Sequence, residues 1–200
     1  MNTLTRYEHA APTWSKKARR LGYTDAYIGF LKRSAITSGP VLDVGTGSGD
    51  FALSWVAAGG STDLTLLDPS AAMLNHAAAQ FAEAGYAPTL LKCGLDDLSC
   101  DAQYDAILAS HVIEHFADPF EAMRGLALRL KPGGQLFMVV SKPHWCNWAI
   151  WLRFRHRWYS AETVCHFAER AGLDLIRTHA FRSGPPKRTS LGYIFQKPQH

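Results

Sequence analysis

The stretch Val41-Leu-Asp-Val-Gly-Thr-Gly-Ser-Gly-Asp50 decides the fold of this chain. Its mostly apolar start is typical of a short buried strand, and the alternate glycines that follow predict a tight turn leading into a helix. Glycine lets a backbone approach a ligand closely, and a helix N-terminus presents free N–H groups to that ligand. Two other motifs are excluded, because the stretch lacks the Gly-Lys-Ser/Thr of a phosphate loop and the G-x-G-x-x-G spacing of dinucleotide-binding turns.

Strands and helices alternate after this stretch, which predicts crossover connections and a parallel sheet. Asp118 and Ser160 stand where N-caps of helices are expected. The turn-rich segment 182–189 predicts a hairpin between the last two strands, and 132–134 predicts a plain turn. The first forty residues look helical, with a break near Gly22. The predicted strands are 41–45, 64–68, 89–93, 104–110, 135–141, 173–181 and 190–196, and the predicted helices are 48–58, 70–84, 119–130 and 160–171.

Polar residues follow several of these strands, at the carboxyl edge where open α/β sheets bind ligands. Asp68 ends the second strand, nineteen residues after Gly49, where a carboxylate can accept hydrogen bonds from both hydroxyls of a ribose. Asp43 lies inside the first strand, and Ser110 and His111 end the fourth. The pattern therefore predicts a ligand-binding site at this edge.

Five segments, in order and spacing, resemble the successive motifs of class I S-adenosylmethionine-dependent methyltransferases: VLDVGTGSGDFAL, LLDPSAAML, LKCGLDDLS, YDAILASHVIEHFADP and LKPGGQLFMVVS. The resemblance covers residues 41–141, and the helix and hairpin that end the chain fit the same family to about residue 197. It implies a Rossmann-like, doubly wound α/β fold with a seven-stranded sheet, a C-terminal antiparallel hairpin and helices on both faces. It also implies S-adenosyl-L-methionine as the cofactor.

The resemblance gives each matching position an implied role. The glycine loop would pass under the methionine moiety, with Asp43 near the amino group and Asp68 on the ribose hydroxyls. The adenine would lie between the residues after the second strand and those after the third, where the family often has an acidic residue in place of Gly94. The implied cofactor-binding residues are Asp43, Gly45, Thr46, Gly47, Gly49, Asp68, Pro69, Met73, Leu95, Asp96, Ser110 and His111.

These roles have structural alternatives. Asp43 could simply order the loop, and Asp96 with Asp97 could form a solvated turn. Transfer of a methyl group depends mainly on alignment of acceptor and methyl, and a general base helps when the nucleophile carries a proton. The candidate bases are His111, His115 and His144, although His115 could be a packing residue. No metal is expected, because no cluster has clear ligand spacing.

Length and composition favour a single domain over residues 1–200. The expected parts are an N-terminal helical cap (1–40), a cofactor-binding core (41–141), a Trp/Arg-rich lid segment (142–159), and a helix with the terminal hairpin (160–200). The chain is 47% hydrophobic, which excludes intrinsic disorder. It shows neither a membrane-spanning run nor a signal-like N-terminus, so a cytoplasmic location is expected. Four scattered cysteines without a CxxC pair are expected to be reduced and structural.

Charge is distributed unevenly along the chain, and this bears on the methyl acceptor. Residues 1–40 carry a net charge of +5, residues 41–141 carry −8, and residues 142–200 carry +7. Four of the six tryptophans fall within residues 145–158, interleaved with Arg153, Arg155 and Arg157. This lid segment could be a solvated cover, a binding surface for an anionic or aromatic acceptor, or an interfacial segment that meets an anionic membrane.

The sequence therefore predicts a methyltransferase acting on an O, N or C atom of a small molecule that is anionic or amphipathic. A lipid- or quinone-type acceptor at the membrane surface is one alternative, and a protein that binds the cofactor without transfer is another. Nucleic acid is not expected as a partner, since the chain lacks the Asn-Pro-Pro-Tyr and Pro-Cys signatures of base methylation and an appended RNA-binding domain. The oligomeric state stays open.

Overall fold

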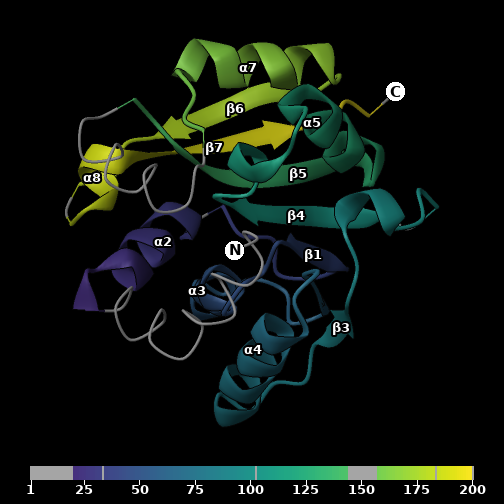
Figure 1. Cartoon of the computed structure of the whole chain (residues 1–200), viewed down its shortest axis with the longest axis vertical. Coiled ribbons are helices and arrows are strands. Elements are labelled where there is room, and N and C mark those ends of the chain that lie inside the picture. Colours follow the sequence, from purple (N-terminus) through teal and green to yellow (C-terminus); the bar gives the residue numbers. More distant parts are fainter. Residues whose placement is uncertain (1–19, 33, 102, 144–156, 183, 200) are drawn as a thin grey trace.

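A computed structural model describes residues 20–32, 34–101, 103–143, 157–182 and 184–199. The regular elements, shown in Figure 1, are α2 (Tyr23–Leu31), β1 (Val41–Val44), α3 (Asp50–Ala57), β2 (Leu64–Leu67), α4 (Ala71–Glu83), β3 (Thr89–Leu91), η1 (Leu95–Asp97), β4 (Tyr104–Ser110), η2 (Ile113–His115), α5 (Pro119–Leu128), β5 (Leu130–Ser141), α7 (Ala161–Arg170), β6 (Asp174–His179), α8 (Pro186–Thr189) and β7 (Ser190–Gln196).

Seven strands form one sheet in the order β3-β2-β1-β4-β5-β7-β6. The first five are parallel to one another, while β7 runs antiparallel to both β5 and β6. The order reverses direction between β1 and β4, and this switch point is where open α/β sheets bind ligands. The predicted seven-stranded sheet and its C-terminal antiparallel hairpin are confirmed.

Helices cover both faces of the sheet, because buried side chains alternate along the central strands. In β4, Ile107 and Ala109 point to the face covered by α5 and α7, while Ala106 and Leu108 point to the face covered by α2, α3 and α4. Strands β5 and β7 alternate in the same way. Figure 1 shows α5 and α7 beside the β4–β7 half, and α3 and α4 beside the β1–β3 half. The two faces thus give two separate hydrophobic clusters.

Helix α2 is the described part of the predicted N-terminal cap, and it lies over the antiparallel half of the sheet. It begins after Gly22, whose left-handed φ of 79° explains the predicted break. The Phe30 ring packs so closely on β7 that a Cβ added at Gly192 would lie 3.0 Å from it. Arg177 of β6 also donates hydrogen bonds to the carbonyl of Phe30, at 3.1 Å, and to Ser34. These contacts hold α2 and the residues just after it against the sheet.

Most predicted elements are present, with differences at their ends. The N-caps Asp118 and Ser160 each accept backbone N–H groups of the helix that follows. The prediction of a plain turn at 132–134 is wrong, because these residues belong to β5, which begins at Leu130. They form an irregularity in the pairing with β4, in which four residues of β5 face one of β4. The predicted hairpin loop 182–189 contains the short helix α8, which sequence reasoning missed.

Most of the predicted lid segment (142–159) lies outside the described residues. Residues 144–156 include His144, Arg153 and Arg155, so these predictions have no structural counterpart here. Of the three arginines, Arg157 is described, and its guanidinium donates to the carbonyl of Ala117 at 2.9 Å. Among the described residues, no helix combines the length and apolar character needed to cross a bilayer. The three described cysteines, Cys93, Cys100 and Cys165, are free thiols.

Candidate functional site

The glycine loop between β1 and α3 forms the centre of the site. Gly45, Gly47 and Gly49 have φ values of 61°, 53° and 81°, in the left-handed region that favours glycine. A Cβ at Gly49 would lie 3.2 Å from both Ala77 and Phe81 of α4, so this glycine allows close packing. A Cβ at Gly47 would approach nothing nearer than the Gly45 carbonyl, at 4.0 Å. The loop therefore faces open space at Gly47, which suits a ligand passing against its backbone.

Asp68, directly after β2, lies beside this loop and is 8% exposed. Its Oδ2 accepts the Gly47 N–H at 2.9 Å, and its Oδ1 accepts the Ser70 N–H at 2.8 Å. Burial raises the pKa of this carboxyl, although the two N–H groups oppose that rise. Each carboxylate oxygen accepts more than one hydrogen bond, so both can still accept from a ribose hydroxyl. The residue thus fits the role implied for it.

Asp43 lies inside β1, just before the glycine loop, and is buried. Its Oδ2 accepts the Thr46 hydroxyl at 2.5 Å, which ties the strand to the glycine loop. Burial raises the pKa of Asp43 to about 7, outweighing the hydrogen bond from Thr46. This hydrogen bond supports the alternative role of Asp43, a carboxyl that orders the loop. A neighbouring cation would also stabilise this carboxylate.

The residues expected around the adenine lie after β2 and β3. Pro69 is exposed and Met73 is buried in the first turn of α4, where its N–H donates to the Ser70 hydroxyl at 3.3 Å. The side chain of Leu95 is buried in the core against Gly125, so its backbone is the part left to flank a ligand. Asp96 is exposed on η1. Its role in adenine recognition stays a prediction.

Asp97 has a structural role in an exposed turn, the alternative given above for it. Its Oδ2 accepts the Gly94 N–H at 3.2 Å, which caps the short helix η1. Gly94 occupies the position where the family often has an acidic residue. The cap formed by Asp97 therefore orders the loop after β3 without a carboxylate at 94.

The end of β4 brings a second group of polar side chains to the same edge. A Cβ added at Gly45 would lie 2.9 Å from Val112, so the segment after β4 touches the glycine loop. The Ser110 hydroxyl donates to the phenol oxygen of Tyr27, on α2, at 3.0 Å. The Tyr27 ring is buried and packs edge-on to Phe51 of α3, with centroids 4.9 Å apart. Sequence reasoning missed Tyr27, which lies 83 residues from its partner.

His111 is placed by its neighbours on η2, β5 and β7. Its side chain is 30% exposed, and its Nδ1 lies 3.2 Å from Glu114 Oε1 and 3.0 Å from the Ser141 hydroxyl. Its Nε2 lies 3.5 Å from the Ser190 hydroxyl. Glu114 was also missed, although a carboxylate within the apolar run Val-Ile-Glu-His-Phe after a strand was an available signal. His115 ends η2, and His144 lies outside the described residues, so the structure gives polar contacts of a candidate base in most detail for His111.

Within the described residues, no group of three or more His, Cys, Asp and Glu side chains is arranged to hold a metal ion. The site as described offers hydrogen-bonding backbone, three buried carboxylates and one imidazole. These groups fit a cofactor that carries an ammonium group, a ribose and a sulfonium. The carboxylates would attract its positive charges, and the open side of the loop would accommodate its chain.

The chain matches the family described as "Methyltransferase domain" over residues 14–178. A ubiquinone biosynthesis O-methyltransferase of Marinobacter nauticus is 31% identical over 123 residues, which are 60% of this chain and 48% of that protein. The chain thus spans about half the length of this relative, and 38% of a similarly named protein of Rickettsia bellii.

Two solved structures share the fold. A methyltransferase of Haloferax volcanii, in complex with a methyltransferase activator, has a TM-score of 0.76 at 20% identity, with 96% of this chain and 97% of that chain covered. The N-methyltransferase NodS of Bradyrhizobium japonicum, in complex with S-adenosyl-L-homocysteine, has a TM-score of 0.69 at 18% identity, with 86% and 84% covered.

Replacing Asp68 should weaken cofactor binding. Asp68→Ala removes the acceptor for the ribose hydroxyls and for the Gly47 N–H, and a hydrogen bond to a charged group contributes about 1.5–3 kcal/mol. We expect the dissociation constant of S-adenosylhomocysteine, measured by calorimetry, to rise about tenfold or more. Asp63→Ala is the matched control, since Asp63 is exposed and directly precedes the opposite end of β2. Equal affinities in Asp68→Ala and the parent protein would overturn the assignment.

Cofactor binding should release a proton through Asp43. With its pKa raised to about 7, Asp43 is largely protonated at pH 6, and an ammonium group placed beside it favours the ionised form. Affinity should therefore fall as pH drops through about 7, and binding at pH 6 should release close to one proton.

Calorimetry in two buffers of different ionisation enthalpy measures this release. We expect little release at pH 8, and none at either pH in Asp43→Asn, which should also bind more weakly at pH 8. Release at pH 6 that persists in Asp43→Asn would assign the proton to another group.

Proposed function

We propose that this chain, which belongs to the methyltransferase-domain family and is an S-adenosylmethionine-dependent methyltransferase, transfers the methyl group to a hydroxyl oxygen of a small anionic or amphipathic molecule. The observation that carries the proposal is the His111 imidazole, partly exposed at the end of β4 and bonded to a buried carboxylate. A hydroxyl nucleophile must lose its proton, and a positioned imidazole is the side chain best suited to accept it near neutral pH.

The relatives support a hydroxyl acceptor. Those with about 30% identity are named as ubiquinone biosynthesis O-methyltransferases, although the matches cover only part of their length. A quinone-type acceptor is therefore one form of this proposal. The segments around the expected acceptor side are basic, whereas the sheet core is acidic, so an anionic acceptor would be drawn toward the cap and α8 rather than toward the carboxylates.

His111→Ala should lower the turnover of a phenolic probe. We expect 3,4-dihydroxybenzoate, offered with labelled S-adenosylmethionine, to be methylated, and the kcat of the variant to fall by about 10²–10⁴-fold because the general base is lost. The KM for the cofactor should change little. His166→Ala is the control, since this histidine is exposed on α7. An unchanged rate and pH profile in His111→Ala would assign His111 to packing.

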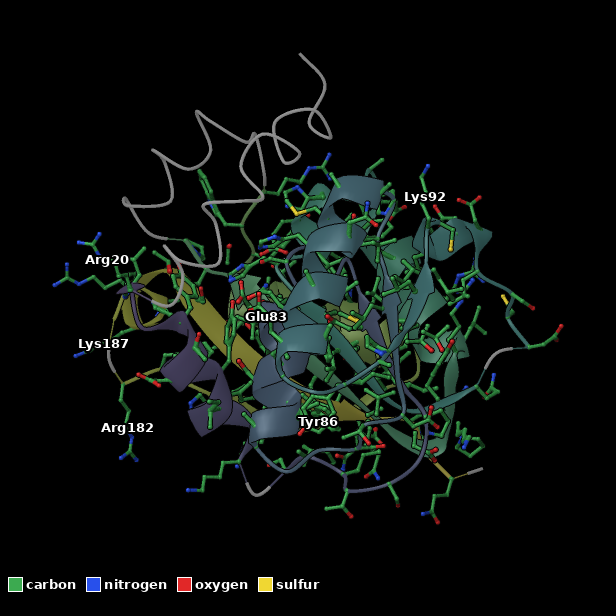
Figure 2. All side chains as sticks on the ribbon, turned by 90° about the horizontal axis from the view of Figure 1, so that it is seen from below. Arg20, Glu83, Tyr86, Lys92, Arg182 and Lys187 are labelled. Atoms are coloured by element: carbon green, nitrogen blue, oxygen red, sulfur yellow. The ribbon has the colours of Figure 1, made fainter. Side chains whose placement is uncertain are left out.

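A membrane-borne acceptor is the second candidate, favoured by a basic rim beside the site. The rim comprises Arg20, Arg182, Lys187 and Arg188, and the exposed side chain of Leu21 lies next to it. A Cβ at Gly184 would lie 2.8 Å from the Leu21 carbonyl, so the loop that carries α8 touches the start of α2. None of the three ion pairs within the described part of the chain includes a residue of the rim. Figure 2 shows Arg20, Arg182 and Lys187 on one side of the molecule.

Anionic vesicles should therefore bind the protein through the rim. We expect co-sedimentation with phosphatidylglycerol vesicles but not with phosphatidylcholine vesicles, weakened by salt. The triple variant Arg182→Ala, Lys187→Ala, Arg188→Ala should lose most of this binding, since each basic side chain contributes about 1 kcal/mol near such a surface. Lys92→Ala, on the opposite side in Figure 2, should bind like the parent. Equal sedimentation of the triple variant and the parent would place the membrane contact outside the rim, and no sedimentation of the parent would leave a soluble acceptor as the proposal.

A further inference from the structure

Glu114 lies at the candidate site with its side chain completely buried. Its Oε1 accepts the Ser141 N–H at 2.7 Å and lies 3.2 Å from His111 Nδ1. Its Oε2 is also buried and has no hydrogen-bond partner among the described residues. Burial alone would raise the pKa of Glu114, but the hydrogen bond to His111, the charge of the protonated ring and the Ser141 N–H together lower it. The carboxylate therefore depends on the imidazole for its charged form.

His111 is held in an unusual backbone conformation. Its φ of 57° makes it the only described non-glycine residue in the left-handed region. Such a conformation costs free energy, and it persists only where the surroundings determine it. Here the His111 N–H donates to the Val139 carbonyl at 2.8 Å, and the ring is fixed at Nδ1 by Glu114 and Ser141. Strain of this kind collects at functional sites.

We propose that Glu114 is a positioning residue that keeps the proton of neutral His111 on Nδ1, so that Nε2 is the basic atom for methyl transfer. A carboxylate only accepts hydrogen bonds, so the ring nitrogen that faces it must be the donor. The lone pair then lies on Nε2, whose described neighbour is the Ser190 hydroxyl at 3.5 Å, a long contact. This inference rests on the proposed hydroxyl acceptor for its chemistry, but not for its geometry.

The resulting step balances in protons and electrons. The acceptor oxygen forms its bond to the methyl carbon as the carbon–sulfur bond breaks, and Nε2 takes the hydroxyl proton. The sulfur keeps the electron pair of the broken bond. The ring then carries a positive charge, and the Nδ1–H directed at Glu114 stabilises that charge through a charge-assisted hydrogen bond. Glu114 itself stays ionised and contacts no reacting atom.

The other titratable groups that interact with this pair are His115 on η2, Tyr27 on α2, Tyr193 on β7 and Tyr159, just before α7. Burial raises the pKa of all three tyrosines, so they are neutral in the range where a histidine titrates. Burial lowers the pKa of His115, with the charge of Glu114 opposing that change. His115 is therefore the group that a pH experiment has to separate from His111.

Glu114→Gln tests the proposal with the shape of the side chain retained, because the amide oxygen can still accept the Ser141 N–H. NMR of histidine labelled with ¹⁵N distinguishes the two neutral tautomers and needs no acceptor. We expect the Nδ1–H form for His111 in the parent protein, and a titration midpoint about one pH unit lower in Glu114→Gln, which loses the charge but keeps the accepting oxygen. In Glu114→Leu, which loses both oxygens, we expect a mixture of tautomers. Glu121→Gln, on the surface of α5, is the matched control and should resemble the parent.

The rate profile gives a second readout. With 3,4-dihydroxybenzoate as the probe, Glu114→Gln should lower kcat and move the acidic limb of the profile to lower pH, while the cofactor KM stays the same. An Nε2–H tautomer in the parent, an unchanged tautomer in Glu114→Leu, or an acidic limb that disappears in His115→Gln would each overturn the proposal. If the NMR result holds and no hydroxyl probe is methylated, the proposed acceptor is wrong while the positioning role of Glu114 stands.

Discussion

The hydrogen bond from the Gly47 N–H to Asp68 is the interaction on which the site depends. The parallel register pairs Val44 with Leu67, so the chain leaves β1 and β2 at the same level of the sheet. The glycine loop from one strand therefore meets the carboxylate from the next, at 2.9 Å. The bond supplies a donor to a buried carboxylate and holds Gly47 in its left-handed conformation. The carboxylate predicted to bind a ribose is thus the same group that shapes the loop.

Three carboxyl groups are buried at this edge of the sheet. Asp43, Asp68 and Glu114 are all nearly inaccessible, and burying a carboxylate is costly unless it is paired or hydrogen-bonded. Burial raises the pKa of Asp43 and Asp68, which have hydrogen bonds but no described cation beside them. The pKa of Glu114 falls because His111 is its partner. A ligand that brings positive charge to Asp43 and Asp68 would offset the free-energy cost of burying their carboxylates.

The sheet was predictable from sequence because its central strands are short, apolar and separated by strong breakers. Strands β4 and β7 begin and end at the residues predicted, since a turn or a helix end flanks each. The errors lie where tertiary pairing overrides local preference. Residues 132–134 carry turn-forming proline and glycine, yet the Gly133 N–H and the Gly134 carbonyl pair with Lys197, near the end of the chain. No local sequence pattern predicts a hydrogen-bond partner so far along the chain.

The same distinction divides the site into a half that sequence could predict and a half that it could not. On the cofactor side, Asp43 bonds to Thr46 three residues away, and Asp68 to Gly47 within one strand–helix–strand unit, so a motif contains the whole arrangement. On the acceptor side, the partners of Ser110, His111 and Glu114 come from α2, β5 and β7, at separations of up to 83 residues. A chain can therefore keep the cofactor half unchanged while α2 and the C-terminal strands change, and with His111 as the proposed base these segments would decide which acceptor it meets.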